Sequence, residues 1–95
     1  MEQEKIVKEV QKITKEYLPS DYQIMLFGSW AKGTASKTSD IDIGILGKEK
    51  VPDNLMFKIR QEVEQIPTLR KIDVVDLNLV GEKFRHAALE HAKPL

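Results

Sequence analysis

Cysteine is absent from the 95 residues of this chain, so neither a disulfide framework nor a zinc site with thiolate ligands can form. An excess of charge is also absent, because 15 basic and 15 acidic residues give a formal net charge of zero. Proteins that grip nucleic acid usually carry a basic excess, so we expect nucleic acid not to be a direct partner. A nucleotide site is still compatible with this balance, because it needs only a local group of residues.

Long hydrophobic runs are missing as well. No stretch approaches the roughly 20 apolar residues that a membrane-spanning helix needs, and the charged N-terminus lacks the apolar core of a signal peptide. We therefore expect a cytoplasmic protein with no membrane partner. The length suits one small domain over residues 1–95, with a single core and no second domain.

Hydrophobic periodicity and turn signals predict four helices and three strands. Helices are expected over residues 2–17, 29–33, 53–65 and 81–92, and strands over residues 22–27, 40–46 and 71–77. This order favours an α+β fold, with a small mixed β-sheet and helices packed mainly on one face. Three strands are few, so we expect one edge of the sheet to be open or covered by a partner.

Residues 27–43 form the most informative stretch of the chain. An apolar strand runs into the corner Gly28-Ser29, and after a loop of small residues a second strand carries Asp40 and Asp42. Side chains two apart on a strand share a face, so these two carboxylates should project together. Paired carboxylates beside a loop rich in backbone donors suit the binding of hard divalent cations against a phosphate chain.

A third carboxylate can come from the strand expected over residues 71–77, which contains Asp73 and Asp76. The two residues are three apart, so on a regular strand they point to opposite faces. Only one of them can therefore join the first pair of carboxylates directly. Strand geometry alone leaves open which one does.

The combination of Gly28-Ser29, a ten-residue spacer and Asp40-Ile41-Asp42 closely resembles the signature of the DNA polymerase β-like nucleotidyltransferase superfamily. In its small size and in its sequence after Phe27, the chain resembles the minimal nucleotidyltransferase (MNT) proteins most. The resemblance covers about residues 5 to 92. It implies the nucleotidyltransferase fold.

The resemblance also implies a catalytic metal site. Asp40, Asp42 and Asp73 would be the catalytic carboxylates and the ligands of Mg²⁺, with two ions expected. The family pattern selects Asp73 over Asp76, and gives Asp73 a second role as candidate base for the attacking hydroxyl. A carboxylate crowded by like charges has a raised pKa in the absence of metal, which suits a base.

The resemblance also implies that the same site binds a nucleoside triphosphate, with ATP as the substrate. Gly28 lets the backbone approach a phosphate without a clashing Cβ atom. Ser29 would offer its hydroxyl and amide groups to the phosphates. Ser39 is counted with these nucleotide-binding residues, although a loop hydrogen bond would explain it equally well.

The MNT resemblance finally implies a partner. Proteins of this kind are commonly paired with a small helical HEPN protein as antitoxin and toxin, and the MNT member neutralises the HEPN ribonuclease by transferring AMP from ATP onto a tyrosine. The implied function is therefore a metal-dependent protein adenylyltransferase that acts as an antitoxin. Two alternatives stay open: a non-catalytic subunit that neutralises its partner by binding it, and nucleotidyl transfer to a small molecule.

The surface that meets such a partner is expected near Trp30 or on the last helix, around Phe84 and His91. His86 and His91 are not expected to bind a metal together. Their spacing of five residues separates them by about 140° around a helix axis, which is unsuited to a shared ion.

Overall fold

The computed structural model describes residues 2–33 and 40–95, and it contains four helices and four strands in these ranges. In chain order they are α1 (Glu2–Tyr17), β1 (Gln23–Phe27), α2 (Ser29–Lys32), β2 (Ile41–Leu46), α3 (Asp53–Glu64), β3 (Ile72–Asp76), α4 (Glu82–Glu90) and β4 (Lys93–Pro94). All seven expected elements are present, and their ends agree with the expected ones to within two residues. None of the described helices is long and apolar enough to cross a membrane.

The strands form one mixed sheet in the order β3-β2-β1-β4. Strand β1 is antiparallel to both β2 and β4, whereas β2 and β3 are parallel. The expectation of three strands is therefore wrong by one. The two-residue strand β4 pairs with β1 at the edge of the sheet, where a proline such as Pro94 is tolerated because its missing N–H has no neighbouring strand to bond. The backbone N–H of Leu95 extends this pairing by donating to the carbonyl of Ile24 at 2.9 Å.

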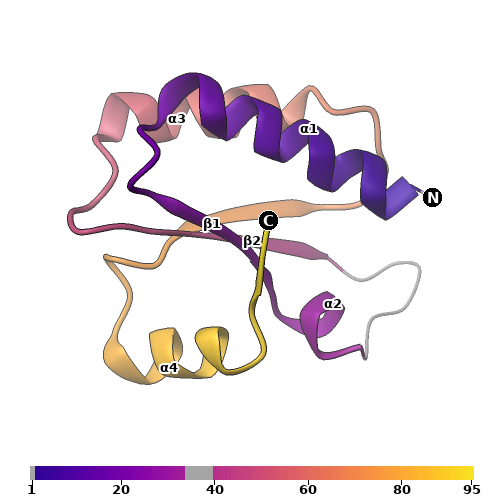
Figure 1. Cartoon of the computed structure of the whole chain (residues 1–95). Coiled ribbons are helices and arrows are strands. Elements are labelled where there is room, and N and C mark those ends of the chain that lie inside the picture. The colour runs from indigo at the N-terminus through magenta and orange to yellow at the C-terminus, as the bar shows by residue number, and fades with distance from the viewer. Residues whose placement is uncertain (1, 34–39) are drawn as a thin grey trace.

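The two long helices, α1 and α3, lie side by side on one face of the sheet (Figure 1). Their apolar residues recur every three or four positions, so one stripe of each helix reaches the sheet. The sheet contributes every second residue of its strands, because side chains alternate between faces. This core contains, among others, Ile6, Val10, Ile13, Leu26, Ile41, Ile43, Ile45, Met56, Ile59, Val63 and Val74, all of them buried.

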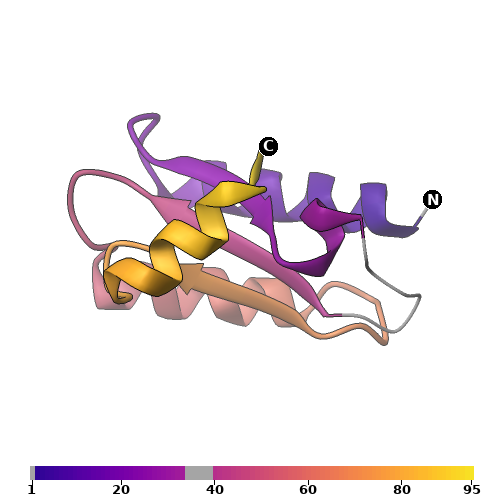
Figure 2. The same ribbon diagram turned by 90° about the horizontal axis from the view of Figure 1, so that it is seen from below.

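The opposite face of the sheet is crossed by α4 (Figure 2). A second, smaller group of buried side chains lies under this helix, formed by Met25, Phe27, Leu77 and Ala88. The expected α+β class and mixed sheet are confirmed, and the two long helices do share one face. Because α4 covers only part of the second face, the sheet residues beyond it stay accessible.

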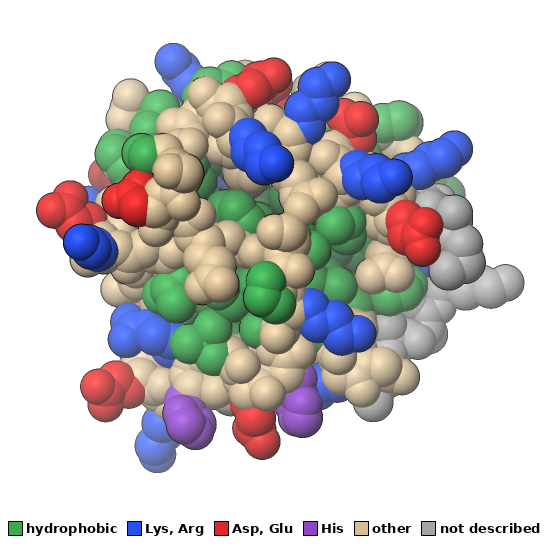
Figure 3. Space-filling model, in the orientation of Figure 1, with side chains coloured by type: hydrophobic (Ala, Val, Ile, Leu, Met, Phe, Trp, Pro, Cys, Tyr) green, Lys and Arg blue, Asp and Glu red, His purple; other side chains and the backbone are tan. Residues whose placement is uncertain are grey.

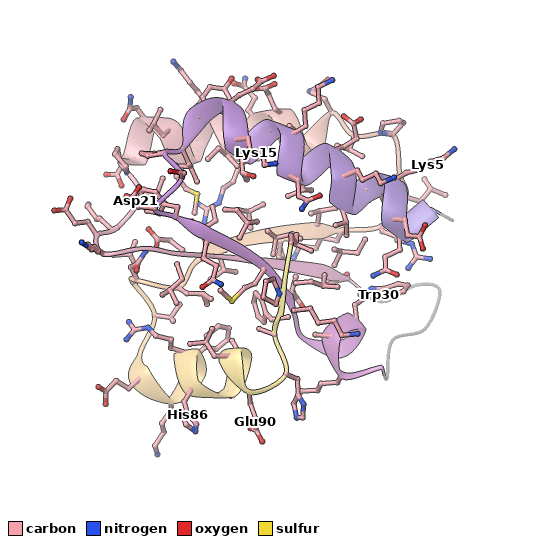
Figure 4. All side chains as sticks on the ribbon, viewed as in Figure 1. Lys5, Lys15, Asp21, Trp30, His86 and Glu90 are labelled. Carbon is pink, nitrogen blue, oxygen red and sulfur yellow. The ribbon has the colours of Figure 1, made fainter. Side chains whose placement is uncertain are left out.

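Charged side chains line the outer surfaces of the two helical layers. Figure 3 shows this distribution on one side of the molecule, with hydrophobic side chains gathered between the charged residues at the top and the histidines and acidic residues at the bottom. Figure 4 shows His86 and Glu90 on α4 pointing away from the sheet. Both histidines are exposed, and Nε2 of His91 lies 3.9 Å from Oε1 of Glu90, so neither faces the carboxylates described next.

Candidate active site

Strand pairing places three of the notable side chains in one row across the sheet. Phe27 on β1 is the register partner of Asp42 on β2, and Asp42 is in turn the register partner of Asp73 on β3. Register partners on adjacent strands project from the same face, here the face of α4. Asp40 immediately precedes β2. The structure therefore brings Asp42 and Asp73 together as neighbours and adds Asp40 at the end of the same strand.

Asp42 lies in an unfavourable position for a charge. Its half-buried carboxyl has a pKa raised above the ordinary value of 3.8, chiefly because burial disfavours the charged form. The negative charges of Asp73 and Asp40 raise this pKa further, and the positive charge of Lys71 lowers it. Asp42 is thus close enough to both Asp73 and Asp40 to be repelled by their charges. A cation among them would relieve this repulsion.

The carboxylates do not surround a common position for a metal ion. Within residues 2–33 and 40–95, no group of three or more acidic, histidine or cysteine side chains could by itself enclose a metal ion. Asp73 makes a salt bridge instead, with its Oδ1 atom 3.6 Å from Nζ of Lys71. Both side chains are partly exposed, so this pair is held weakly and its carboxylate can change partner.

Gly28 closes one side of Asp42. It has a φ of +74°, which is unfavourable for residues with a side chain, and it ends β1 just before α2. A Cβ atom at this position would collide with the Oδ2 atom of Asp42 and would lie 3.1 Å from its Cγ atom. Glycine is therefore required here both by the backbone conformation and by the closeness of the carboxylate. Ser29 follows as the first residue of α2, whereas Ser39 lies outside the described residues.

Trp30 links this corner to the start of β3. Its ring packs partly buried against the main core, and the guanidinium of Arg70 lies 4.8 Å from the ring centroid, in a cation–π arrangement. Figure 4 shows Trp30 on the α2 side of the molecule. Arg70 thus lies against this corner, and the next residue, Lys71, places a cation beside Asp73. Neither residue was singled out from the sequence, because only the folded sheet brings positions 70 and 71 beside positions 30 and 42.

Asp76 lies on the opposite face from Asp73 and is buried. Its Oδ2 atom accepts a hydrogen bond from the backbone N–H of Val51 at 2.8 Å. Its Oδ1 atom accepts two more, from the backbone N–H and the side-chain amide of Asn78, at 2.9 and 2.7 Å. Asp76 therefore connects the end of β3 to the segment before α3 and has no contact with the row of carboxylates.

A groove of about 820 Å³ opens beside the carboxylates, along the outer edge of β3. Asp42 and Asp73 line it together with Phe27, Val75 and Phe84, and further residues come from α3 and the turn after it. The rings of Phe27 and Phe84 meet edge to face, with centroids 6.1 Å apart at 82°. The site therefore combines a charged end with an apolar wall, and Phe84 was not expected to be part of it.

Comparison with known proteins gives one family match, described as polymerase beta, nucleotidyltransferase, over residues 5–95. Among individual relatives, the chain is 29% identical over 76 residues to a Haemophilus influenzae protein named "Probable protein adenylyltransferase MntA". That alignment covers 80% of this chain and 66% of the relative, so the chain spans slightly less than two thirds of the relative's length.

Two solved structures have a similar fold. One is a toxin–antitoxin crystal structure with AMP-PNP, at 24% identity and a TM-score of 0.74, covering 92% of this chain and 69% of that chain. The other is a tri-AMPylated Shewanella oneidensis HEPN toxin in complex with its MNT antitoxin, at 22% identity and a TM-score of 0.71, covering 99% and 71%. At these identities the likeness is evidence of fold. The family match over residues 5–95 is the broader finding, and by it this chain belongs to the polymerase beta nucleotidyltransferase family.

Proposed function

We propose that this chain transfers AMP from ATP to a tyrosine of a partner protein, a helical protein of the HEPN type, and that it acts in this way as an antitoxin. The observation that carries the proposal is the register of Asp42 with Asp73 beside the Gly28 corner. The name of the Haemophilus relative and the AMPylated toxin in the Shewanella complex support this acceptor class. AMP-PNP in a structural neighbour supports ATP as the donor.

Mg²⁺ fits the residues of this site. The ligands available here are the carboxylate oxygens of Asp40, Asp42 and Asp73, and Mg²⁺ prefers oxygen ligands. A bound cation would also offset the repulsion that Asp42 experiences from the other two carboxylates. Because they do not enclose an ion alone, substrate phosphates and water would complete its coordination. When bound, one or two Mg²⁺ ions offset the charge on the attacking and leaving oxygens of a phosphoryl transfer.

The other residues of the site then have separate tasks. Gly28, which carries no side chain, lets the backbone of this corner approach the triphosphate closely, and Ser29 offers a hydroxyl and an amide group to its phosphates. Ser39 is retained as a nucleotide contact on the family resemblance alone. Asp73, the register partner of Asp42, accepts the proton of the acceptor hydroxyl. Lys71 holds the Asp73 carboxylate until the substrates are bound.

The setting of this activity is also part of the proposal. Residues 1–95 would act as one nucleotidyltransferase domain, located in the cytoplasm, where ATP is available. The partner supplies the acceptor. Neutral overall charge agrees with a protein partner rather than a nucleic acid.

Labelled ATP tests the proposal. The chain is incubated with Mg²⁺, ATP labelled at the α-phosphate and the HEPN-type protein encoded beside it, and the label on that protein is measured. We expect the label to be transferred by the wild type and by the control D21N, which removes an exposed carboxylate far from the site. D42N should reduce transfer at least a hundredfold. Protection of cells by D42N equal to that by the wild type would instead favour the non-catalytic binding subunit.

A further inference from the structure

Lys71 places a positive charge on the carboxylate face of the sheet. It directly precedes β3, and the backbone N–H of Ile41 donates to its carbonyl at 2.9 Å, so the parallel pairing of β2 with β3 extends to this position. Residues two apart on a strand share a face, so Lys71 projects on the same side as Asp73. Its Nζ atom lies 3.6 Å from Oδ1 of Asp73, and its charge also acts on Asp42. One ammonium group therefore interacts with two carboxylates.

Among the described residues, Arg60 and Arg70 also line the groove beside the carboxylates. The Nε and Nη2 atoms of Arg60 donate to the carbonyl of Val74 at 3.2 and 2.9 Å. The guanidinium of Arg70 lies 4.8 Å from the centroid of the Trp30 ring. Arg60 thus covers the edge of β3 and Arg70 lies against α2, whereas Lys71 lies against the carboxylates.

The ion pair of Lys71 with Asp73 can exchange easily. The two side chains are 70% and 37% exposed, so water screens the pair and its contribution to stability is small. A lysine ammonium is a compact charge on a flexible stem, so it can move while the backbone stays in place. In the proposed function Asp73 is a metal ligand. Lys71 therefore competes with a divalent cation for the same carboxylate.

A bound triphosphate would offer Lys71 a second partner. The carboxylates and a triphosphate together carry more negative charge than two divalent ions offset. The phosphates are assigned to the corner at Gly28, where an added Cβ atom would collide with Oδ2 of Asp42. They would thus lie beside a carboxylate on which the charge of Lys71 already acts. An ammonium released from Asp73 could then reach the phosphates by a change of side-chain rotamer.

We infer that Lys71 is an exchangeable cation of the active site: it pairs with Asp73 until a divalent ion binds there, and it then contacts the phosphates of ATP. This inference rests on the proposed function, since it concerns the metal and the nucleotide of the same reaction. Lys71 opposes binding of the metal alone and favours binding of metal and nucleotide together. The site thereby becomes selective for the metal–nucleotide complex.

The reactivity of single lysines in the wild-type chain tests the exchange directly. Limited acetylation by acetic anhydride is followed by mass spectrometry in EDTA, with saturating Mn²⁺, and with Mn²⁺ and α,β-methylene-ATP, an analogue that cannot release AMP. We expect Mn²⁺ to raise acetylation of Lys71 by about twofold, because a weak ion pair is broken. The analogue should lower it again below the value in EDTA. Lys58, which is exposed on α3 and outside the groove, should react equally in all three states.

Substitutions of Lys71 provide a second measurement, by isothermal titration calorimetry. K71Q should bind Mn²⁺ alone about threefold more tightly, because the competing ion pair is lost. It should bind Mn²⁺ with α,β-methylene-ATP about tenfold more weakly, because a charge-assisted contact is lost. K71R keeps the charge and should retain nucleotide affinity to within about twofold. K58Q removes an equal charge outside the groove and should change neither affinity by more than about 1.5-fold.

The possible outcomes separate this inference from the proposed function. Protection of Lys71 by the analogue, together with the opposite shifts in K71Q, would uphold the exchange even if no AMP reached the partner. Equal acetylation of Lys71 in all three states would overturn the exchange even if AMP transfer proceeds. Weaker binding of both Mn²⁺ and nucleotide by K71Q would also overturn it, because Lys71 would then support the site instead of competing for Asp73. The same shifts in K58Q would overturn it as well, because they would reflect net charge alone.

Discussion

Gly28 and Asp42 depend on each other at the scale of single residues. The glycine adopts a positive φ and lies so close to the carboxylate that no side chain fits between them. The sequence pattern marked both residues, but it gave no sign that they are in contact. That contact follows from the antiparallel pairing of β1 with β2, in which Phe27 and Asp42 are register partners and Gly28 comes next. Replacing either residue should therefore disturb the other.

G28A should lower stability and displace the Asp42 carboxylate. We expect a loss of roughly 1–3 kcal/mol in the free energy of unfolding, because strain at a positive φ and a collision act together. Gly33 provides the control, since its φ is +79° but no atom of the described residues lies within 4 Å of an added Cβ atom. Chemical denaturation should show a smaller loss for G33A, of about 1 kcal/mol. AMP transfer should fall only in G28A, and equal transfer by both variants would contradict the proposed contact.

D42N should stabilise the metal-free protein at neutral pH. The raised pKa of Asp42 means that the folded state favours the protonated form, so this residue contributes most below about pH 3.8. Its contribution declines as pH rises through the raised pKa, and at neutral pH the charged carboxylate opposes folding. Because the side chain is only partly buried, the gain in D42N should be below about 1 kcal/mol.

Thermal unfolding in EDTA at several pH values measures this difference. The advantage of D42N should be present near pH 7 and should shrink as the pH is lowered toward 4. D21N, with an exposed carboxylate away from the site, should show no comparable dependence. A D42N variant that is less stable than the wild type at pH 7 would mean that the carboxylate cluster does not repel as described.

At the scale of elements, local sequence signals predicted the helices and three of the strands, whereas the contacts between distant elements depend on long-range pairing. The helices were visible because apolar residues recur at helical intervals, and strand parity correctly separated Asp73 from Asp76. Strand β4 was missed because two residues with a proline carry no periodicity. Arg70 beside Trp30, and Phe84 beside Phe27, could not be foreseen, because each pair joins elements distant in the chain. The assigned roles of the carboxylates remain predictions.

Asp76 is the residue through which two of these elements are connected. Three hydrogen bonds to its buried carboxylate hold Val51 and Asn78 against the end of β3. D76A should therefore destabilise the protein by about 2–4 kcal/mol, because three donors lose their acceptor. D73N, three residues earlier, should change stability by less than about 0.5 kcal/mol and should abolish AMP transfer. Denaturant titration of both variants checks this, and similar losses in both would refute the division of roles.

At the scale of the whole molecule, the sheet has unequal edges. In the described part of the chain, β1 is flanked by β4, whereas β3 has no strand on its outer side. Arg60 covers part of this edge, because its Nε and Nη2 atoms donate to the carbonyl of Val74 at 3.2 and 2.9 Å. Exposed apolar residues, among them Phe57 and Leu79, line a second hollow past this edge. These features suit a protein partner.

A stable complex should be visible when the chain is produced together with the HEPN-type protein that we propose as its partner. Size-exclusion chromatography at micromolar concentration should show both proteins eluting together, and D42N should keep the complex, since the substitution removes charge but no surface. Separate elution would refute a stable complex, although a brief encounter of enzyme and substrate would remain compatible with AMP transfer.

The most direct test of the account is the metal dependence of ATP binding. The central claim is that clustered carboxylates at Asp40, Asp42 and Asp73 repel a bare triphosphate and accept it only with a divalent cation. Isothermal titration calorimetry of ATP into the chain should show binding with Mg²⁺, and affinity weakened at least tenfold in EDTA and in D42N with Mg²⁺. An ATP affinity that is the same in EDTA as in Mg²⁺ would contradict the claim.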